Sequence, residues 1–344
     1  MEGTMKRLWF KGAGDVELQE VPIPEIDENG ILVKIAYAGI CGSDVHGYTK
    51  GGMFGGIYPE PNTFGHEFAG VVVETGAAVV DFKVGDRVWV DPLGCVRDPR
   101  LTCTAGGFGE YIAVIKPVKD VTVFILPDEL SFKNASLIEP FGVGVHTKNR
   151  AKPTVDDKVL LFGAGPIGLM AWSALKHQGI ENLIVAERMP SRIELARSLG
   201  AHVVDNTDID AYEYAAEQFG TATVNAYERP DVTVVVDCVG IGALMGEYLE
   251  KGRCNSRFTT LGLDQTPLTI KPGEFMSKQF SVFGARGYEP VDIKEVIEVL
   301  VNGEVDITRI ITGVYALEDY EAAFAAACDR NSGMKVVFEI DGTL

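Results

Sequence analysis

The stretch KVLLFGAGPIGLM, residues 158–170, decides the fold of this chain. Its apolar start predicts a buried strand, and its second half predicts a helix that begins at Pro166 and continues to Gln178. Between the two lies the pattern G-x-G-x-x-G, in the strand–turn–helix context that a dinucleotide-binding loop requires. We therefore expect residues 163–168 to bind a pyrophosphate. A glycine turn in a nucleotide-free α/β fold is the alternative.

The residues of this loop have separate physical tasks. Gly163 permits the tight turn, Gly165 lets the backbone approach a pyrophosphate, and Gly168 allows the helix to pack closely against the strand. Pro166 is tolerated in the first helical turn because its missing N–H would have no partner there, and the exposed N–H groups at the helix start attract an anion. The cofactor-binding prediction covers these four residues and Ile167.

The next apolar strand, NLIVAER at residues 182–188, ends in charged residues. Glu187 follows Gly168 by 19 positions, where a carboxylate can hold the two ribose hydroxyls of an adenosine. The same carboxylate would repel a 2′-phosphate. The adjacent Arg188 favours NADP instead, because a guanidinium can bind the 2′-phosphate of that cofactor. The sequence predicts NAD as the cofactor, with NADP as the less favoured alternative.

Apolar runs and helical stretches alternate from residue 158 to residue 285. This alternation implies a parallel sheet, so the predicted fold class is α/β with a doubly wound, Rossmann-type sheet. The expected strands are 158–162, 182–186, 202–205, 232–237, 257–262 and 280–285, and the expected helices include 166–178 and 191–199.

The first 135 residues or so read differently. They contain short β-rich runs separated by glycine and proline, at 31–36, 67–74, 86–90 and 110–114. A helix at 292–301 and a terminal strand at 335–340 could return to this first module. We expect two domains, since one hydrophobic core rarely organises 344 residues. Residues 1–147 and 286–344 form the β-rich domain, and residues 148–285 form the dinucleotide-binding domain.

Composition limits the partners. With 31 basic and 49 acidic residues, the formal net charge of −18 repels phosphate backbones and anionic lipids. No apolar run reaches the roughly 20 residues of a membrane-spanning helix. The N-terminus lacks the apolar segment of a signal peptide. We expect a cytoplasmic protein that acts on a small molecule, with no nucleic acid and no membrane as partner.

Two short clusters carry metal-ligating residue types: CGSDVH at residues 41–46 and GHE at residues 65–67. Thiolate, imidazole and carboxylate together suit zinc. A site with three or fewer firm protein ligands leaves a position open for water or substrate, which distinguishes catalytic from structural zinc. A core thiol at Cys41 and a hydrogen-bonded buried imidazole at His66 are the alternative.

A family resemblance rests on these segments and others in order along the chain: ICGSDVH, FGHEFAGVVVETGAAVVDFKVGDRV, ASLIEPFGVGVH, LLFGAGPIG and ALEDYEAAF. Over essentially its whole length the chain resembles the zinc-dependent medium-chain dehydrogenases, and within them the sorbitol, butanediol and threonine dehydrogenase branch. The resemblance implies that the β-rich domain is a GroES-like catalytic domain.

Carried onto this chain, the resemblance makes Cys41, His66 and Glu67 the ligands of one catalytic zinc ion. Glu139, in the IEP motif, corresponds to a carboxylate that binds the metal directly or through its water. Asp44 corresponds to a carboxylate that orients the ligand histidine, although an ordinary helix N-cap is an equal alternative.

Ser43 and His46 match the proton relay of the family, which carries the proton of the alcohol to solvent. A solvated histidine is the alternative for His46. Arg286, in FGARGY, corresponds to an arginine near the cofactor and substrate hydroxyls, with a surface salt bridge as the alternative. Phe108 and Tyr48 are suggested as pocket walls on the same basis, with core packing as the more frequent role of aromatic residues in such positions.

The chain departs from the family in one lobe. Most relatives hold a second, structural zinc there with four closely spaced cysteines, whereas VDPLGCVRDPRLTCTAGGFGEY contains only Cys95 and Cys103. Two thiols cannot close a four-ligand site alone, so we predict no structural zinc. The apolar run FSVFGA at 280–285 is expected to be a sheet edge that pairs with a second subunit, which predicts a homo-oligomer, either a dimer or a tetramer.

The predicted activity is zinc-dependent oxidation of a secondary alcohol of a polyol or vicinal diol to a ketone, with NAD as hydride acceptor. An amino alcohol such as threonine is an alternative substrate, because the same zinc ligands serve both reactions. A nucleotide-binding member of the superfold without alcohol turnover is a further alternative.

Overall fold

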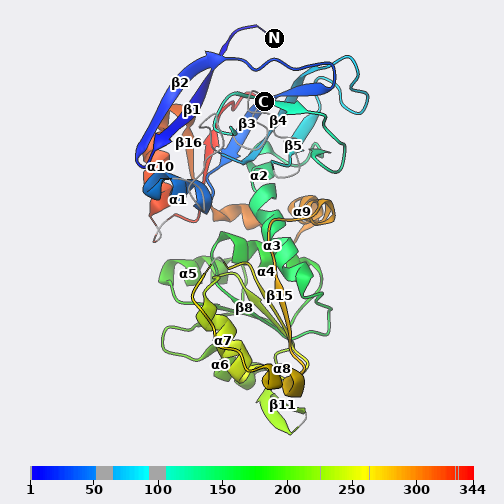
Figure 1. The fold of residues 1–344 in the computed structure, drawn as a ribbon, viewed down its shortest axis with the longest axis vertical. Coiled ribbons are helices and arrows are strands. Elements are labelled where there is room, and N and C mark those ends of the chain that lie inside the picture. The colour runs from blue at the N-terminus through cyan, green and yellow to red at the C-terminus, as the bar shows by residue number, and fades with distance from the viewer. Residues whose placement is uncertain are drawn as a thin grey trace. The chain divides into compact units, whose positions relative to one another are not determined.

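A computed structural model describes residues 2–51, 65–92, 106–224, 226–262, 264–329, 331 and 333–344 (Figure 1). The chain divides into two compact units, each with its own core. Unit 1 comprises Met1–Pro140 and Thr308–Leu344, and unit 2 comprises Phe141–Ile307. The fold is α/β, with a GroES-like and a Rossmann-type part, as the sequence predicts.

Unit 2 contains a six-stranded parallel sheet in the order β10-β9-β8-β13-β14-β15. This is the strand order of a doubly wound dinucleotide-binding sheet, whose ligand lies where the order reverses beside the first strand, here β8. The strands are β8 (Val159–Phe162), β9 (Leu183–Glu187), β10 (Val203–Asp205), β13 (Val234–Asp237), β14 (Arg257–Thr260) and β15 (Ser281–Gly284). All six strands coincide with expected ones.

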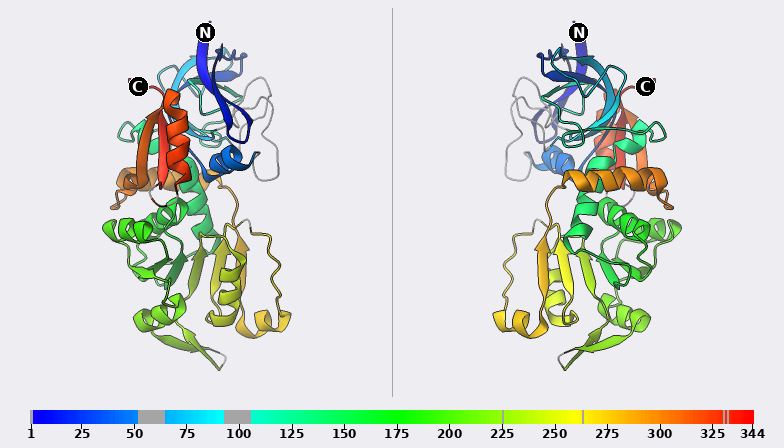
Figure 2. Two further views of the ribbon diagram at one scale, coloured as in Figure 1. Left: turned by 90° about the vertical axis from the view of Figure 1, so that its left-hand side faces the viewer. Right: turned by 90° about the vertical axis from the view of Figure 1, so that its right-hand side faces the viewer.

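The helices of unit 2 cover this sheet. All four residues of β8 are buried, so both of its faces are covered, and Leu160 and Phe162 pack with Tyr212 and Tyr248 from two helices on one face. The helices are α3 (Ile138–Arg150, which begins in unit 1), α4 (Pro166–His177), α5 (Pro190–Ser198), α6 (Ala211–Phe219), α7 (Gly242–Lys251), α8 (Pro272–Lys278) and α9 (Pro290–Asn302). A hairpin of β11 (Thr221–Val224) and β12 (Tyr227–Pro230) projects from unit 2 (Figure 2).

Unit 1 is built around a seven-stranded sheet. Its order is β16-β17-β3-β4-β5-β7, with β6 paired to β3. The strands are β3 (Gly30–Gly39), β4 (Glu67–Thr75), β5 (Arg87–Val90), β6 (Tyr111–Ile115), β7 (Val123–Ile125), β16 (Ile311–Ala316) and β17 (Lys335–Glu339). The other elements are the hairpin β1 (Thr4–Gly12) and β2 (Asp15–Pro22), the helices α1 (Gly42–Lys50), α2 (Phe132–Ala135) and α10 (Tyr320–Cys328), and the 3-10 turns η1 (Ile307–Ile310) and η2 (Leu317–Asp319).

The division between the units differs from the expected boundaries at residues 147 and 285. The main reason is α9, which belongs to unit 2 because its apolar face, including Val296, is buried there. Asp292 on α9 also accepts hydrogen bonds from Nδ1 of His146 at 2.8 Å and from Asn149 at 2.9 Å, both on α3. The role of His146, open at the sequence level, is therefore to join these two helices.

No helix of the described ranges is both long enough and apolar enough to cross a membrane.

Candidate metal and cofactor sites

Cys41 lies at the turn between β3 and α1. Its backbone N–H donates a 3.0 Å hydrogen bond to Oδ2 of Asp44, which closes the first turn of the helix as in a capping box. The thiol is free and half-buried. The end of a buried strand and a capped helix thus fix the backbone that carries the sulfur.

His66 and Glu67 follow a turn that only glycine fits well. Gly65 has a φ of +87°, and a Cβ there would come within 2.5 Å of the Phe108 ring. Phe108 is fully buried and packs edge-on against Phe338, with ring centroids 5.0 Å apart. The turn therefore rests on the aromatic core, which fixes where the chain enters β4.

Asp44 connects the two clusters. Its carboxylate is fully buried, and Oδ1 accepts the N–H of Gly65 at 3.3 Å and lies 3.7 Å from Nδ1 of His66. The sequence left two roles open for Asp44, helix capping and orientation of the histidine, and the geometry combines them. A carboxylate beside Nδ1 favours Nε2 as the atom that would bind a metal.

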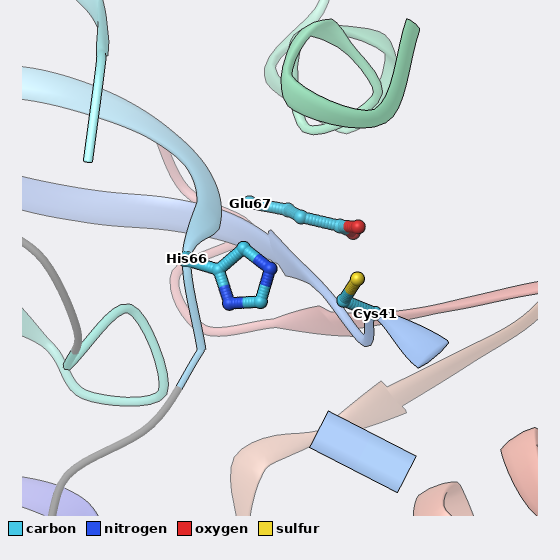
Figure 3. A group of neighbouring side chains, drawn as sticks. All are labelled: Cys41, His66 and Glu67. Carbon is cyan, nitrogen blue, oxygen red and sulfur yellow. The ribbon is translucent and has the colours of Figure 1, made fainter. Parts of the chain in front are cut away.

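Cys41, His66 and Glu67 come together, and Figure 3 shows their side chains gathered in one region. One ligand atom of each lies within 4.8 Å of the others. Zinc ligands at about 2.0–2.3 Å from the ion stand roughly 3.3–3.8 Å apart, so small rotations would complete a shell. Oε1 of Glu67 is buried and accepts no hydrogen bond from any described residue, which a metal ligand would explain. The three residues fit a zinc ion.

Glu139 lies near this group without belonging to it. Its side chain is buried in the first turn of α3, and burial raises its pKa to about 7, with a further contribution from the charge of Glu67. The charges of His66 and Lys335 act in the opposite direction. Glu139 thus interacts electrostatically with His66, Glu67 and Lys335, and its role as a metal ligand stays a prediction.

The metal-free site favours bound protons. Burial by itself would lower the pKa of His66, but Asp44 and Cys41 outweigh it and raise this pKa well above its usual value. Burial raises the pKa of Asp44. Because zinc binds the deprotonated forms of its ligands, metal binding would displace protons from this cluster.

Lys335 is a residue of this site that the sequence analysis missed. It opens β17, is 4% exposed, and forms an ion pair with Oε2 of Glu67. Burial would lower its pKa, but the charges of Glu67 and Cys41 raise it instead. The available signal was a lysine at the start of the otherwise apolar strand run KVVF.

The two expected relay residues both lie on α1. Oγ of Ser43 is 3.5 Å from Nε2 of His66, and Ser43 is buried. His46 is exposed one helical turn later. Ser43 therefore lies beside His66 and His46 lies at the surface, and the relay between them stays a prediction.

Phe108 is buried in the unit 1 core and Tyr48 is half-buried against it, which agrees with core packing; a role as pocket walls stays a prediction. Tyr48 stacks on Phe324 with ring centroids 4.5 Å apart, and Phe108 meets the same ring edge-on at 6.1 Å. Their aromatic area is used in packing. Cys95 and Cys103, on which the prediction of no structural zinc depends, lie outside the described residues.

The glycine-rich loop of unit 2 has the expected form. Gly163 has a φ of +95°, and its N–H donates to the carbonyl of Ala186 at 2.8 Å. A Cβ on Gly168 would overlap the carbonyl oxygen of Gly163. Gly165 caps α4, whose first residue is Pro166, and Ile167 follows half-buried. The turn thus presents the helix start to an anion.

Glu187 ends β9 beside this loop. Its Oε2 accepts the N–H of Ala164 at 2.8 Å, and its Oε1 accepts the N–H groups of Arg188 and Met189 at 2.7 and 3.0 Å. A carboxylate oxygen can accept two hydrogen bonds, so Oε2 retains a position for a ribose hydroxyl. Glu187 therefore shapes the loop and can still contact a nucleotide.

Three arginines of unit 2 concern the expected cofactor site: Arg188 directly after β9, Arg192 in the first turn of α5, and Arg286 shortly after β15. Arg188 and Arg286 are exposed, the latter just after β15. Arg192, which the sequence analysis missed, has its guanidinium against the loop: a Cβ on Gly165 would lie 3.4 Å from Nη1. Its position in the first turn of the helix after NLIVAER was the available signal.

Comparison with known proteins identifies the family. Residues 27–126 match the alcohol dehydrogenase GroES-like domain, and residues 166–302 match the zinc-binding dehydrogenase domain, which together exceed half of the chain. The chain therefore belongs to the zinc-dependent medium-chain dehydrogenases, in their sorbitol, butanediol and threonine dehydrogenase branch. It is an enzyme of the alcohol dehydrogenase type.

Similar proteins cover nearly the whole chain. Sorbitol dehydrogenase of Bacillus subtilis is 31% identical over 97% of this chain and 97% of its own. L-threonine 3-dehydrogenase of Streptomyces avermitilis is 33% identical over 94% of this chain and 95% of its own. The crystal structure of 2R,3R-butanediol dehydrogenase from Bacillus subtilis has a TM-score of 0.84 at 27% identity and covers 98% of this chain and 100% of its own.

Proposed function

We propose that this enzyme oxidises a secondary alcohol of a polyol or vicinal diol to a ketone, with NAD as the hydride acceptor. The convergence of Cys41, His66 and Glu67 supports this proposal most strongly. The reaction converts the alcohol and NAD⁺ into the ketone, NADH and one proton. The similarity to sorbitol and butanediol dehydrogenases favours substrates with neighbouring hydroxyls.

Cys41, His66 and Glu67 would hold the zinc ion, with Glu139 as a further carboxylate. A bound zinc ion would supply Lewis acidity toward the substrate oxygen. Asp44 positions His66 from the Nδ1 side and fixes the backbone of both clusters through its bonds to Cys41 and Gly65. The chain thereby sets the ligand geometry before any substrate arrives.

Ser43 and His46 would carry the released proton. The hydroxyl of Ser43 can both accept and donate a hydrogen bond beside His66, and the exposed imidazole of His46 would pass the proton on to water. Arg286 is assigned to the cofactor and substrate hydroxyls by the family resemblance alone.

The loop of Gly163, Gly165 and Gly168 would hold the pyrophosphate of the dinucleotide. Glu187 would hold the adenosine ribose and disfavour a 2′-phosphate, which supports NAD. Arg188 and Arg192 provide positive charge nearby, so NADP is the alternative cofactor.

A substrate panel tests the proposal. Polyols, vicinal diols, simple secondary alcohols and threonine are each tested with NAD and with NADP, and the absorbance of reduced nicotinamide is followed with and without a chelator. We expect the highest kcat/KM for a polyol or diol with NAD, and loss of activity with the chelator. Higher kcat/KM with NADP would contradict the cofactor assignment.

Threonine-type amino alcohols are a second candidate substrate class, favoured by the 33% identity to a threonine dehydrogenase. A higher kcat/KM for threonine than for every polyol would establish it. A protein that binds zinc and NAD but oxidises none of these compounds would be the catalytically silent alternative.

We also propose that the enzyme is a homo-oligomer. β15 is an edge strand of the unit 2 sheet, and its residues Ser281, Val282 and Phe283 are only partly buried. An unpaired strand edge is suited to pairing with a second copy. Light scattering after size exclusion should show a dimer or a tetramer, and a monomer at working concentration would contradict this proposal. The cytoplasmic location and the absence of nucleic-acid and membrane partners stay predictions from composition.

A further inference from the structure

Lys335 reaches Glu67 across a strand. β3 lies between β17 and β4, and Gly39 of β3 is paired with Val337 on one side and with Glu67 on the other. A Cβ on Gly39 would overlap Oε2 of Glu67 and lie 3.1 Å from Cε of Lys335. The space left by Gly39 therefore lets the side chain of Lys335 meet the carboxylate.

The pair is almost completely buried. Lys335 is 4% exposed and Glu67 is fully buried, and the ammonium also donates to the carbonyl of Ile40 at 3.0 Å. A buried ion pair contributes little net stability compared with well-packed apolar residues, because both charges lose their hydration. Stability therefore does not explain a buried lysine before the valine and phenylalanine residues of β17.

The positive charge of Lys335 lies beside a carboxylate that would bind the metal. Glu67 is also one of the three residues whose ligand atoms converge, so the same carboxylate faces the ammonium through Oε2 and has a buried Oε1 without a described hydrogen bond. A dication bound through Oε1 would lie close to a fixed positive charge in a medium of low dielectric. Like charges repel strongly there.

We propose that Lys335 is a built-in counter-charge that weakens zinc binding: it pairs with Glu67 and thereby competes with the metal for that carboxylate. Lys335 is a positioning residue in this account, because it acts through Glu67. The proposal rests on the proposed zinc site. Its effect is to keep zinc exchangeable.

The test is zinc affinity, measured by competition with a chromogenic chelator on the full-length protein. We expect Lys335→Met to bind zinc at least tenfold more tightly than the parent, because the competing charge is lost while the side-chain length is kept. We expect Lys335→Arg to remain within threefold of the parent. Lys34→Met is the matched control, since Lys34 is a partly buried lysine of β3 that is ion-paired with Asp341, and it should leave the affinity unchanged.

Unchanged or weaker zinc binding in Lys335→Met would overturn the proposal. If metal-free Lys335→Met does not fold, the variant is prepared with zinc, and the rate of zinc release to excess chelator is measured instead. We expect slower release than from the parent. Equal or faster release would overturn the proposal. A parent that binds no zinc would refute the proposed function itself, whereas a zinc-binding parent with an indifferent Lys335→Met variant would refute only this inference.

Discussion

The backbone N–H of Ala164 donates a 2.8 Å hydrogen bond to Oε2 of Glu187, which joins the glycine-rich loop to the end of the neighbouring strand. The residue that is expected to select the nucleotide thus also supports the glycine-rich turn. A substitution at Glu187 should therefore affect the affinity for any dinucleotide, and NAD more than NADP.

We predict that Glu187→Ala raises the Kd of NAD at least tenfold, since a hydrogen bond to a charged group contributes about 1.5–3 kcal/mol. The Kd of NADP should rise less, because the repulsion of the 2′-phosphate is relieved. Glu187→Gln, which keeps one acceptor oxygen, should be intermediate. Quenching of protein fluorescence by each nucleotide gives both constants. An equal loss for the two nucleotides would leave Glu187 with a structural role only.

Gly168→Ala should disrupt the cofactor loop. The added methyl group would overlap the carbonyl oxygen of Gly163, and backbone atoms cannot yield as a flexible side chain can. We expect a lower melting temperature and at least a tenfold weaker affinity for NAD. Gly273→Ala is the control: it lies in α8 with open space around its Cα, so it should keep or slightly raise the melting temperature. Normal NAD binding by Gly168→Ala would contradict this description of the turn.

The metal-free protein should lose stability relative to Glu139→Gln as the pH rises. The pKa of Glu139 is about 7 in the folded protein and 4.5 in the unfolded reference, so the folded state binds more protons between these values. Unfolding then becomes easier with rising pH, by on the order of 3 kcal/mol across the interval. Urea titrations of chelator-treated protein at pH 4.5, 5.5, 6.5 and 7.5 compare parent and variant. A constant difference between the two proteins would show that Glu139 does not titrate there.

Asp44→Asn should weaken zinc binding by about 10- to 100-fold, the usual effect of losing a carboxylate that orients a ligand histidine. The asparagine is nearly isosteric but removes the negative charge beside Nδ1 of His66. Chelator competition measures the change. Asp210→Asn removes the capping carboxylate at the N-cap of α6, which belongs to unit 2, and should leave zinc affinity unchanged. Equal zinc affinity in Asp44→Asn and the parent would mean that Asp44 caps the helix but does not orient His66 for metal binding.

Much of the fold follows from local sequence patterns. The strands of unit 2 are short, apolar and separated by helices, so that each strand carries its own signal, as in KVLLF. The hairpin of β11 and β12 gave no such signal, because its strands TATV and YERP are short, at least partly exposed, and contain no apolar run. The expected boundary at residue 285 differs from the division of the structure because α9 is held by Asp292, whose partners His146 and Asn149 lie far away in the sequence.

The candidate site likewise depends partly on contacts between residues far apart in the sequence. Cys41, His66 and Glu67 belong to dense local motifs, which is why sequence alone could propose them. Lys335 reaches them from a strand almost 270 residues further along, and its approach depends on the missing side chain of Gly39. Arg192 likewise lies against Gly165 of the glycine-rich loop because of where α5 is placed in the fold. Contacts of this kind arise from tertiary structure and leave no short motif.

Zinc content gives the most direct measurement of the central claim. Protein produced with ample zinc and then freed of loosely bound metal should contain one zinc ion per chain by elemental analysis, and the double variant Cys41→Ser/His66→Ala should contain less than about one tenth of that while keeping its NAD affinity. A parent without zinc, or a double variant that retains the full amount, would contradict a metal site formed by Cys41, His66 and Glu67.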